Sequence, residues 1–160
     1  MTGEPVRTDS RGGRWADLGR TELIELGRTI VTERLEELGC QVRRPAAVVR
    51  GPLAVTTPSG RALELFVSTQ RLGGYVFWTK SRFELRSDRL AAIVLLDGAE
   101  DPMLYLIPSI EWRSPSPPLK DRPNAGKRSE PEYGVSIARS SLAQLDRYRW
   151  DRASGPRFLL

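Results

Sequence analysis

The sequence predicts an α/β fold, in which a mixed central sheet of about five strands is flanked by an N-terminal and a C-terminal helix. Apolar residues recur at three- and four-residue steps from Leu23 to Leu38, which is typical of an amphipathic helix. Short segments rich in β-forming residues follow, separated by glycine, proline and aspartate turns. Two later segments, 90–96 and 103–108, are continuously apolar, as buried central strands are.

The predicted elements follow one another without an internal repeat. The helix covers 21–38 and ends at Gly39, a residue that favours the left-handed conformation of a helix stop. The turn Pro58-Ser59-Gly60 predicts a hairpin between two of the strands. Ser140 or Ser141 caps the second helix, which places Leu142, Leu145 and Tyr148 on one face. Strands are expected at 40–42, 48–49, 53–57, 61–69, 75–78, 90–96, 103–108 and 132–138.

The length of 160 residues fits one domain. Residues 1–16 lack periodicity and predict a flexible N-terminal arm, which leaves 17–160 as a single α/β domain. Residues 113–131 are dense in proline, serine and charge, and predict a long exposed loop. No apolar run approaches the roughly 20 residues of a membrane-spanning helix, and the first residues do not form a signal peptide. We therefore expect a cytoplasmic protein with no membrane partner.

Composition excludes several kinds of chemistry. The chain has no histidine and one cysteine, Cys40, so the common zinc sites, Ser-His-Asp triads, Cys-His dyads and internal disulfides are ruled out. The net charge of +5 permits attraction to nucleic acid. Only three residues are lysine, and a GC-rich genome would impose such an arginine-dominated charge without selection for binding. The basicity alone therefore does not identify a partner.

Four segments together carry a resemblance to a known family. They are LGRTIVTERLEELGCQV (26–42), VRRPAAVVRGPLAVTTPSGRALELFVSTQR (42–71), GYVFWTKSRF (74–83) and YLIPSIEW (105–112), with a weaker echo in EPEYGVSI (130–137). In this order they resemble the PD-(D/E)XK nuclease-like superfamily, and in particular its small uncharacterised bacterial members. The resemblance covers roughly residues 20–112 and implies a restriction-endonuclease-like core.

The resemblance also implies where a metal site would stand. The family needs an acid before the second strand and an acid-x-lysine on its hairpin partner, and these carboxylates hold Mg²⁺ beside the scissile phosphate. In this chain the first position falls on Gly51 or Pro52, and the second on Phe66-Val67-Ser68. Neither supplies the charge that a divalent cation needs. We therefore expect a catalytically degenerate nuclease-like domain with no catalytic residue and no metal.

Such a domain would act as a nucleic-acid- or protein-binding module, with DNA, RNA or a protein as its partner. Under this hypothesis four basic side chains contact phosphates, namely Arg71, Lys80, Arg82 and Arg86. The aromatic residues Tyr75, Phe77 and Trp78 either stack on bases or fill the core. The face of the first helix opposite its apolar stripe carries Glu22, Glu25, Arg28, Glu33, Glu36 and Glu37.

Two alternatives stay open. The first is a Mg²⁺-dependent nuclease with a relocated site, built from Glu64, Lys80 and a helix glutamate, either Glu25 or Glu33. Its metal ligands would be Glu64 and Glu33. Glu64 shares strand parity with Phe66 and Ser68, so its carboxylate would point to the face where the family's site lies. The second is a structural subunit that acts through oligomerisation. Its contact surface would use Trp112 and the apolar C-terminus, with Trp150 and residues 158–160.

Overall fold

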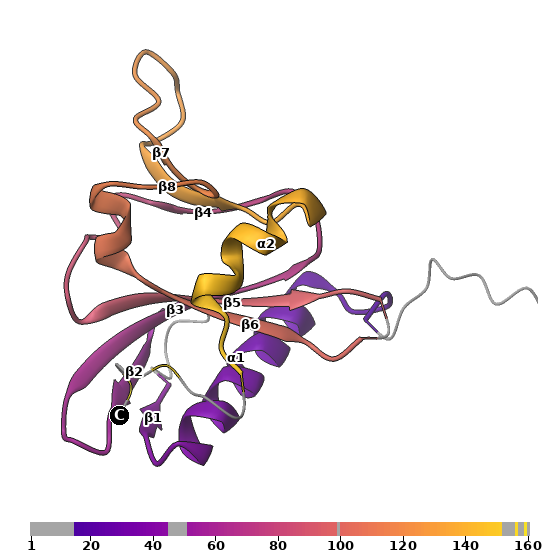
Figure 1. Ribbon diagram of the computed structural model, residues 1–160, viewed down its shortest axis with the longest axis vertical. Coiled ribbons are helices and arrows are strands. Elements are labelled where there is room, and N and C mark those ends of the chain that lie inside the picture. Colours follow the sequence, from indigo (N-terminus) through magenta and orange to yellow (C-terminus); the bar gives the residue numbers. More distant parts are fainter. Residues whose placement is uncertain (1–14, 45–50, 99, 152–155, 157–158, 160) are drawn as a thin grey trace, which may run out of the picture.

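The computed structural model describes residues 15–44, 51–98, 100–151, 156 and 159, and Figure 1 labels its main elements. Two α-helices and eight strands are joined by short 3₁₀ turns within these residues. The helices are α1 (Arg20–Glu37) and α2 (Leu142–Leu145). The strands are β1 (Gln41–Arg43), β2 (Leu53–Thr56), β3 (Ala62–Arg71), β4 (Tyr75–Thr79), β5 (Arg89–Leu96), β6 (Met103–Pro108), β7 (Leu119–Arg122) and β8 (Glu132–Ser136).

A five-stranded mixed sheet forms the centre of the fold, in the order β1-β2-β3-β5-β6. Only β3 and β5 are parallel, and every other neighbouring pair is antiparallel. The β2–β3 hairpin turns at Gly60, whose φ of +88° is left-handed and favours glycine. The predicted mixed sheet and its flanking helices are confirmed.

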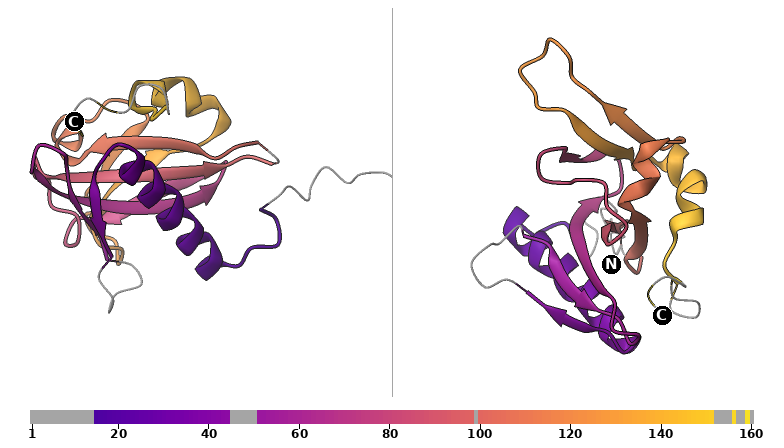
Figure 2. Two further views of the ribbon diagram at one scale, coloured as in Figure 1. Left: turned by 90° about the horizontal axis from the view of Figure 1, so that it is seen from below. Right: turned by 90° about the vertical axis from the view of Figure 1, so that its left-hand side faces the viewer.

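Helix α1 covers one face of this sheet, as Figure 2 shows. Its apolar stripe buries Val31 and Leu35 completely against the side chains of β2, β3 and β5. The closest approach is at Gly27, where even a Cβ atom would overlap the hydroxyl of Thr69 on β3. Glycine is therefore required there by the short distance between the helix and the sheet.

A second, three-stranded sheet in the order β4-β8-β7 covers the opposite face of the central sheet, together with α2 (Figure 1). The apolar layer between the two sheets contains Phe83 and Trp112, whose ring centroids are 5.7 Å apart in an edge-to-face arrangement. The indole N–H of Trp112 donates to the carbonyl of Gly134 at 3.0 Å. Strand β5 lies between α1 and this second sheet, and all of its residues are buried.

Several expectations differ from the structure. The second sheet was not predicted, and its strand β7 lies inside the segment 113–131 that was expected to be a loop. The LKDR sequence of β7 has one buried residue followed by three exposed ones, so it carries little strand signal. The C-terminal helix is a single α-helical turn between two 3₁₀ turns. The predicted strand at 48–49 lies outside the described residues.

The two chain ends also differ from expectation. Residues 1–14 of the predicted arm lie outside the described residues, but Trp15 is buried in the core beneath α1. Trp150 and Leu159 are buried in the same core, and Trp112 is 1% exposed. These three residues therefore do not form the exposed surface expected for oligomerisation, while residues 158 and 160 are outside the described part. Within that part, no helix is long and apolar enough to cross a membrane.

Candidate binding groove

A groove of about 630 Å³ lies between α1, the second half of β3, and β4. The N-terminal half of α1 forms one wall and β4 forms the other. A volume of this size is within the roughly 300–1,000 Å³ typical of ligand sites. The lining residues are Arg20, Leu23, Ile24, Arg28, residues 66–71, residues 75–79 and Arg82.

Two open strand edges face this groove. Strand β2 pairs with β3 only from Ala62 to Leu65, so no described strand pairs with the same edge of β3 beyond that point. Strand β4 is the terminal strand of the three-stranded sheet, so its other edge is also unpaired among the described residues. The two strands diverge from the turn at Gly73-Gly74 and join different sheets.

Backbone groups on these edges point into the groove. The N–H groups of Glu64 and Leu72 donate toward β5, to the carbonyls of Asp88 and Leu96. Because backbone N–H groups alternate in direction along a strand, those of Val67, Thr69 and Arg71 point to the open edge. The groove thus presents hydrogen-bond donors and acceptors of the main chain as well as side chains.

The charge of the groove has one sign. Four of its lining residues are arginine and none of the described lining residues is acidic. Arg20 and Arg82 are exposed, and their side chains form no ion pair or hydrogen bond within the described chain. Arg71 donates to three backbone carbonyls before α1, those of Trp15 at 2.7 Å, Ala16 at 3.3 Å and Leu18 at 3.0 Å. These carbonyls are neutral, so the positive charge of Arg71 is not cancelled.

Arg28 differs from the other three arginines because it is only 5% exposed. Its Nη1 atom donates to the carbonyl of Gly51 at 2.7 Å. Burial lowers the pKa of Arg28 below its usual value, although the negative charge of Glu25 acts to raise it. The sequence pattern placed this residue on the face of the helix opposite the apolar stripe, and that expectation is wrong. A signal was present, because Arg28 shares the helical spacing of Ile24, Val31 and Leu35.

Aromatic side chains stand on the β4 wall. Phe77 is 53% exposed, the largest value among the exposed large hydrophobic residues described. Its ring stacks on Tyr75 with the centroids 6.1 Å apart, and the guanidinium of Arg122 lies 4.0 Å from the centroid of Tyr75. Val76 and Trp78 point to the opposite face of β4, into the core between the sheets. The three aromatic residues of β4 therefore divide between surface and core.

Glu64, the central residue of the alternative nuclease site, belongs to an ion-pair cluster elsewhere. Its carboxylate accepts from Arg86 at 3.1 Å and from two nitrogens of Arg89 at 2.8 and 3.1 Å. Arg86 also pairs with Asp88 at 3.1 Å. Because the carboxylate of Glu64 compensates its charge, Arg89 is tolerated in the interior.

The other residues of that alternative site lie apart from Glu64. Lys80 pairs with Asp121 of β7 at 2.6 Å, and Glu25 pairs with Arg44 at 3.4 Å. Glu33 is exposed on α1, which covers the face of the sheet opposite to the one where Glu64 lies. The structure does not bring Glu64, Lys80 and a helix glutamate together. Among the described residues, no three His, Cys, Asp or Glu side chains gather closely enough to hold a metal ion.

The four basic residues predicted to contact phosphates fall into two groups in the structure. Arg71 and Arg82 line the groove, whereas Lys80 and Arg86 are engaged in ion pairs outside it. Arg20 and Arg28 of α1 were not predicted to contribute. The positions that the resemblance assigns to the acid-x-lysine, Phe66 and Ser68, line the groove.

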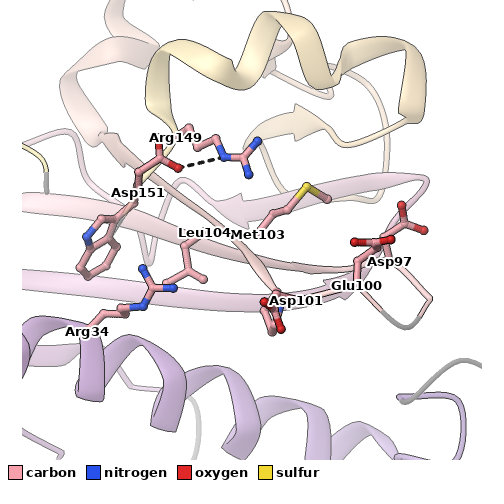
Figure 3. Close-up of a pocket in the computed structure, with 10 residues that line it drawn as sticks. Arg34, Asp97, Glu100, Asp101, Met103, Leu104, Arg149 and Asp151 are labelled. Carbon is pink, nitrogen blue, oxygen red and sulfur yellow. Dashed lines mark ion pairs between the residues drawn. The ribbon is translucent and has the colours of Figure 1, made fainter. Parts of the chain in front are cut away.

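A smaller cavity of about 340 Å³ lies at the other end of α1 and is drawn in Figure 3. It contains both signs of charge: two arginines, Arg34 and Arg149, and four acids. Arg149 pairs with Asp151 at 3.3 Å (Figure 3). Because its charges are mixed and partly paired, this cavity favours no particular ligand, and the arginine-lined groove is the better candidate site.

Comparison with known proteins finds no matching family model, no matching curated protein and no matching solved structure. The function of this chain therefore has to be inferred from the chemistry of its groove.

Proposed function

We propose that the protein is a nucleic-acid-binding module without catalytic activity, and that the groove between α1, β3 and β4 receives single-stranded DNA or RNA. The observation that carries the proposal is the groove's charge, with four arginines and no acid among its described lining residues. Phosphate contacts from arginine supply most of the affinity of a nucleic-acid-binding protein. The groove offers that chemistry on both walls.

The exposed aromatic residues favour a single strand over a duplex. Bases of an unpaired strand stack on aromatic side chains, and each such contact contributes about 1–3 kcal/mol. Phe77 is exposed and already stacked on Tyr75, and the guanidinium of Arg122 lies over the ring of Tyr75. A base that extends the stack beyond Phe77 would leave its phosphates near the arginines of the groove.

The absence of catalysis in this proposal rests on donor chemistry. Phe66 and Ser68 offer a ring and a hydroxyl where the resemblance implies an acid and a lysine. The nearest acid along β3, Glu64, has its carboxylate held by two guanidinium groups. That carboxylate would have to give up both partners before it took part in hydrolysis.

The test is a titration of fluorescein-labelled single-stranded DNA and RNA, with a matched duplex, followed by anisotropy at several salt concentrations. The groove variant removes the two exposed arginines whose side chains have no hydrogen bond in the described chain, as Arg20→Ala with Arg82→Ala. A matched control removes two exposed arginines outside the groove, as Arg113→Ala with Arg128→Ala. The two double variants have the same net charge.

We expect the wild-type protein to bind single strands more tightly than duplex, and binding to weaken steeply with salt. Each phosphate contact contributes about 0.7 to the slope of log K against log salt for a single strand, so the groove variant should lose about 1.4 of that slope. The control should lose much less. Equal losses in both variants, or no binding by the wild type at low salt, would refute the proposal.

A further inference from the structure

Arg28 is the only charged residue of α1 that is buried within the described chain. A guanidinium carries five N–H donors and a charge that protein conditions do not remove. The described structure gives Arg28 one hydrogen bond, to the neutral carbonyl of Gly51, and no carboxylate within ion-pair distance. Most of its donors are therefore left without a partner in the described chain, and Glu25, whose charge acts on Arg28, lies beyond ion-pair distance.

Arg89 in the same chain provides a comparison. It is also nearly buried, at 9% exposed, but the carboxylate of Glu64 accepts from two of its nitrogens. Burial of a charge is expensive unless an opposite charge compensates it. Arg89 has a carboxylate in direct contact, whereas Arg28 has none within ion-pair distance among the described residues.

The position of Arg28 indicates where compensation comes from. Its side chain lines the groove, in which no described lining residue is acidic. Arg20 lies two turns earlier on α1 and lines the same groove, so the field there is positive along the helix. An anion that entered the groove would meet the free donors of Arg28 in a partly desolvated place, where a charge-assisted hydrogen bond is strong.

We infer that Arg28 is a phosphate-binding residue, and that its buried guanidinium holds a phosphate group of the ligand inside the groove. The inference rests on the proposed function for the identity of the ligand, but not for the anion site itself. A guanidinium suits this task because its planar fork donates two parallel hydrogen bonds to a phosphate. A buried arginine also keeps one fixed orientation, so it sets the position of the strand as well as adding affinity.

The test compares three variants by the dissociation constant for the single strand and by thermal stability without ligand. Arg28→Met removes the charge and keeps an unbranched side chain. Arg28→Lys keeps the charge and removes the planar fork. Arg89→Met is the matched control, because it removes a buried guanidinium that does not line the groove. Inorganic phosphate, with sodium chloride at equal ionic strength, serves as a second probe through the rise in melting temperature.

Without ligand, we expect Arg28→Met to melt at or above the wild-type temperature, since it removes an uncompensated buried charge, and Arg89→Met to melt lower. Loss of a charge-assisted hydrogen bond, about 1.5–3 kcal/mol, corresponds to affinity weaker by about tenfold to a hundredfold in Arg28→Met. Arg28→Lys should fall between it and the wild type. Arg89→Met, measured at a temperature where it is folded, should bind as the wild type does.

A folded Arg28→Met protein whose dissociation constant for the oligonucleotide is within twofold of the wild-type value would overturn the inference. If Arg28→Met does not fold, the same criterion is applied to Arg28→Lys. Oligonucleotides with and without a 5′-phosphate separate the two phosphate sources: a loss seen only with the phosphorylated strand assigns the terminal phosphate, and an equal loss assigns the backbone. If the wild type binds no oligonucleotide but phosphate raises its melting temperature through Arg28, the proposed function fails while the anion site stands.

Discussion

The contact between α1 and β3 at Gly27 gives a prediction whose sign depends on two opposing effects. In the interior of an ordinary helix, Gly27→Ala would stabilise the protein by about 1 kcal/mol, because alanine loses less backbone entropy on folding. Here the added Cβ would overlap the hydroxyl of Thr69 and lie 2.9 Å from its Cβ and 3.3 Å from its Cγ2. Overpacking of a core typically costs about 1–3 kcal/mol.

The overlap involves atoms close to the backbone of β3, so it cannot be relieved by rotation of a long side chain. The cost should therefore lie near the upper end of that range and exceed the helix-propensity gain. We expect Gly27→Ala to lower the free energy of unfolding by about 1–2 kcal/mol. With a urea m-value of about 2 kcal/mol/M, the unfolding midpoint should fall by about 0.5–1 M.

A double-mutant cycle with Thr69→Ala isolates the contact. The hydroxyl of Thr69 is buried without a hydrogen-bond partner in the described chain, so Thr69→Ala alone should change stability little. In the double variant the overlap is relieved, and we expect it to be more stable than Gly27→Ala by about 1 kcal/mol or more. A Gly27→Ala midpoint at or above the wild-type value, with an unchanged m-value, would show that the helix and sheet are not in tight contact here.

Two further predictions concern the ion-pair cluster around Glu64 and the buried thiol and phenol groups of Cys40 and Tyr105. Glu64→Gln leaves the guanidinium of Arg89 without its carboxylate. Because Glu64 is 37% exposed, we expect the free energy of unfolding in urea to fall by about 1–2 kcal/mol. The affinity for oligonucleotides should not change. An unaltered midpoint would contradict this role. Burial raises the pKa of the Cys40 thiol and of the Tyr105 phenol, so above about pH 9 the unfolded state loses these protons first and the free energy of unfolding should fall with rising pH. Urea midpoints measured from about pH 8 to 10.5 check this, and a flat profile would exclude it.

Local patterns in the sequence predicted most elements of the central sheet and α1. The helical spacing of α1, the turn at 58–60 and the apolar runs of β5 and β6 are each set by neighbouring residues, and the structure confirms them. The three-stranded sheet was missed because its formation depends on a pairing between β4 and β8, whose residues lie more than fifty positions apart. Nothing in the intervening sequence indicates that pairing.

The candidate site could be predicted only in part, for a related reason. Arg71 and Arg82 were identified because they adjoin a predicted strand, and both line the groove. Lys80 and Arg86 had the same sequence context but meet Asp121 and Glu64, which come from other strands. Whether a cation is free or paired depends on such distant contacts, so single-sequence reasoning could not separate the two groups.

The divergence of β3 and β4 has a consequence for the free protein. Within the described part of the chain each strand has one unpaired edge, and an unpaired edge is a template on which the same strand of another molecule can pair. Copies that approach through this groove bring identical clusters of arginine together, and the like charges oppose self-association. Because the Debye length falls to about 8 Å at physiological ionic strength and further at higher salt, this protection weakens as salt is added. The arginines that we propose to bind a polyanion would therefore also oppose pairing between copies of the unliganded protein at low salt.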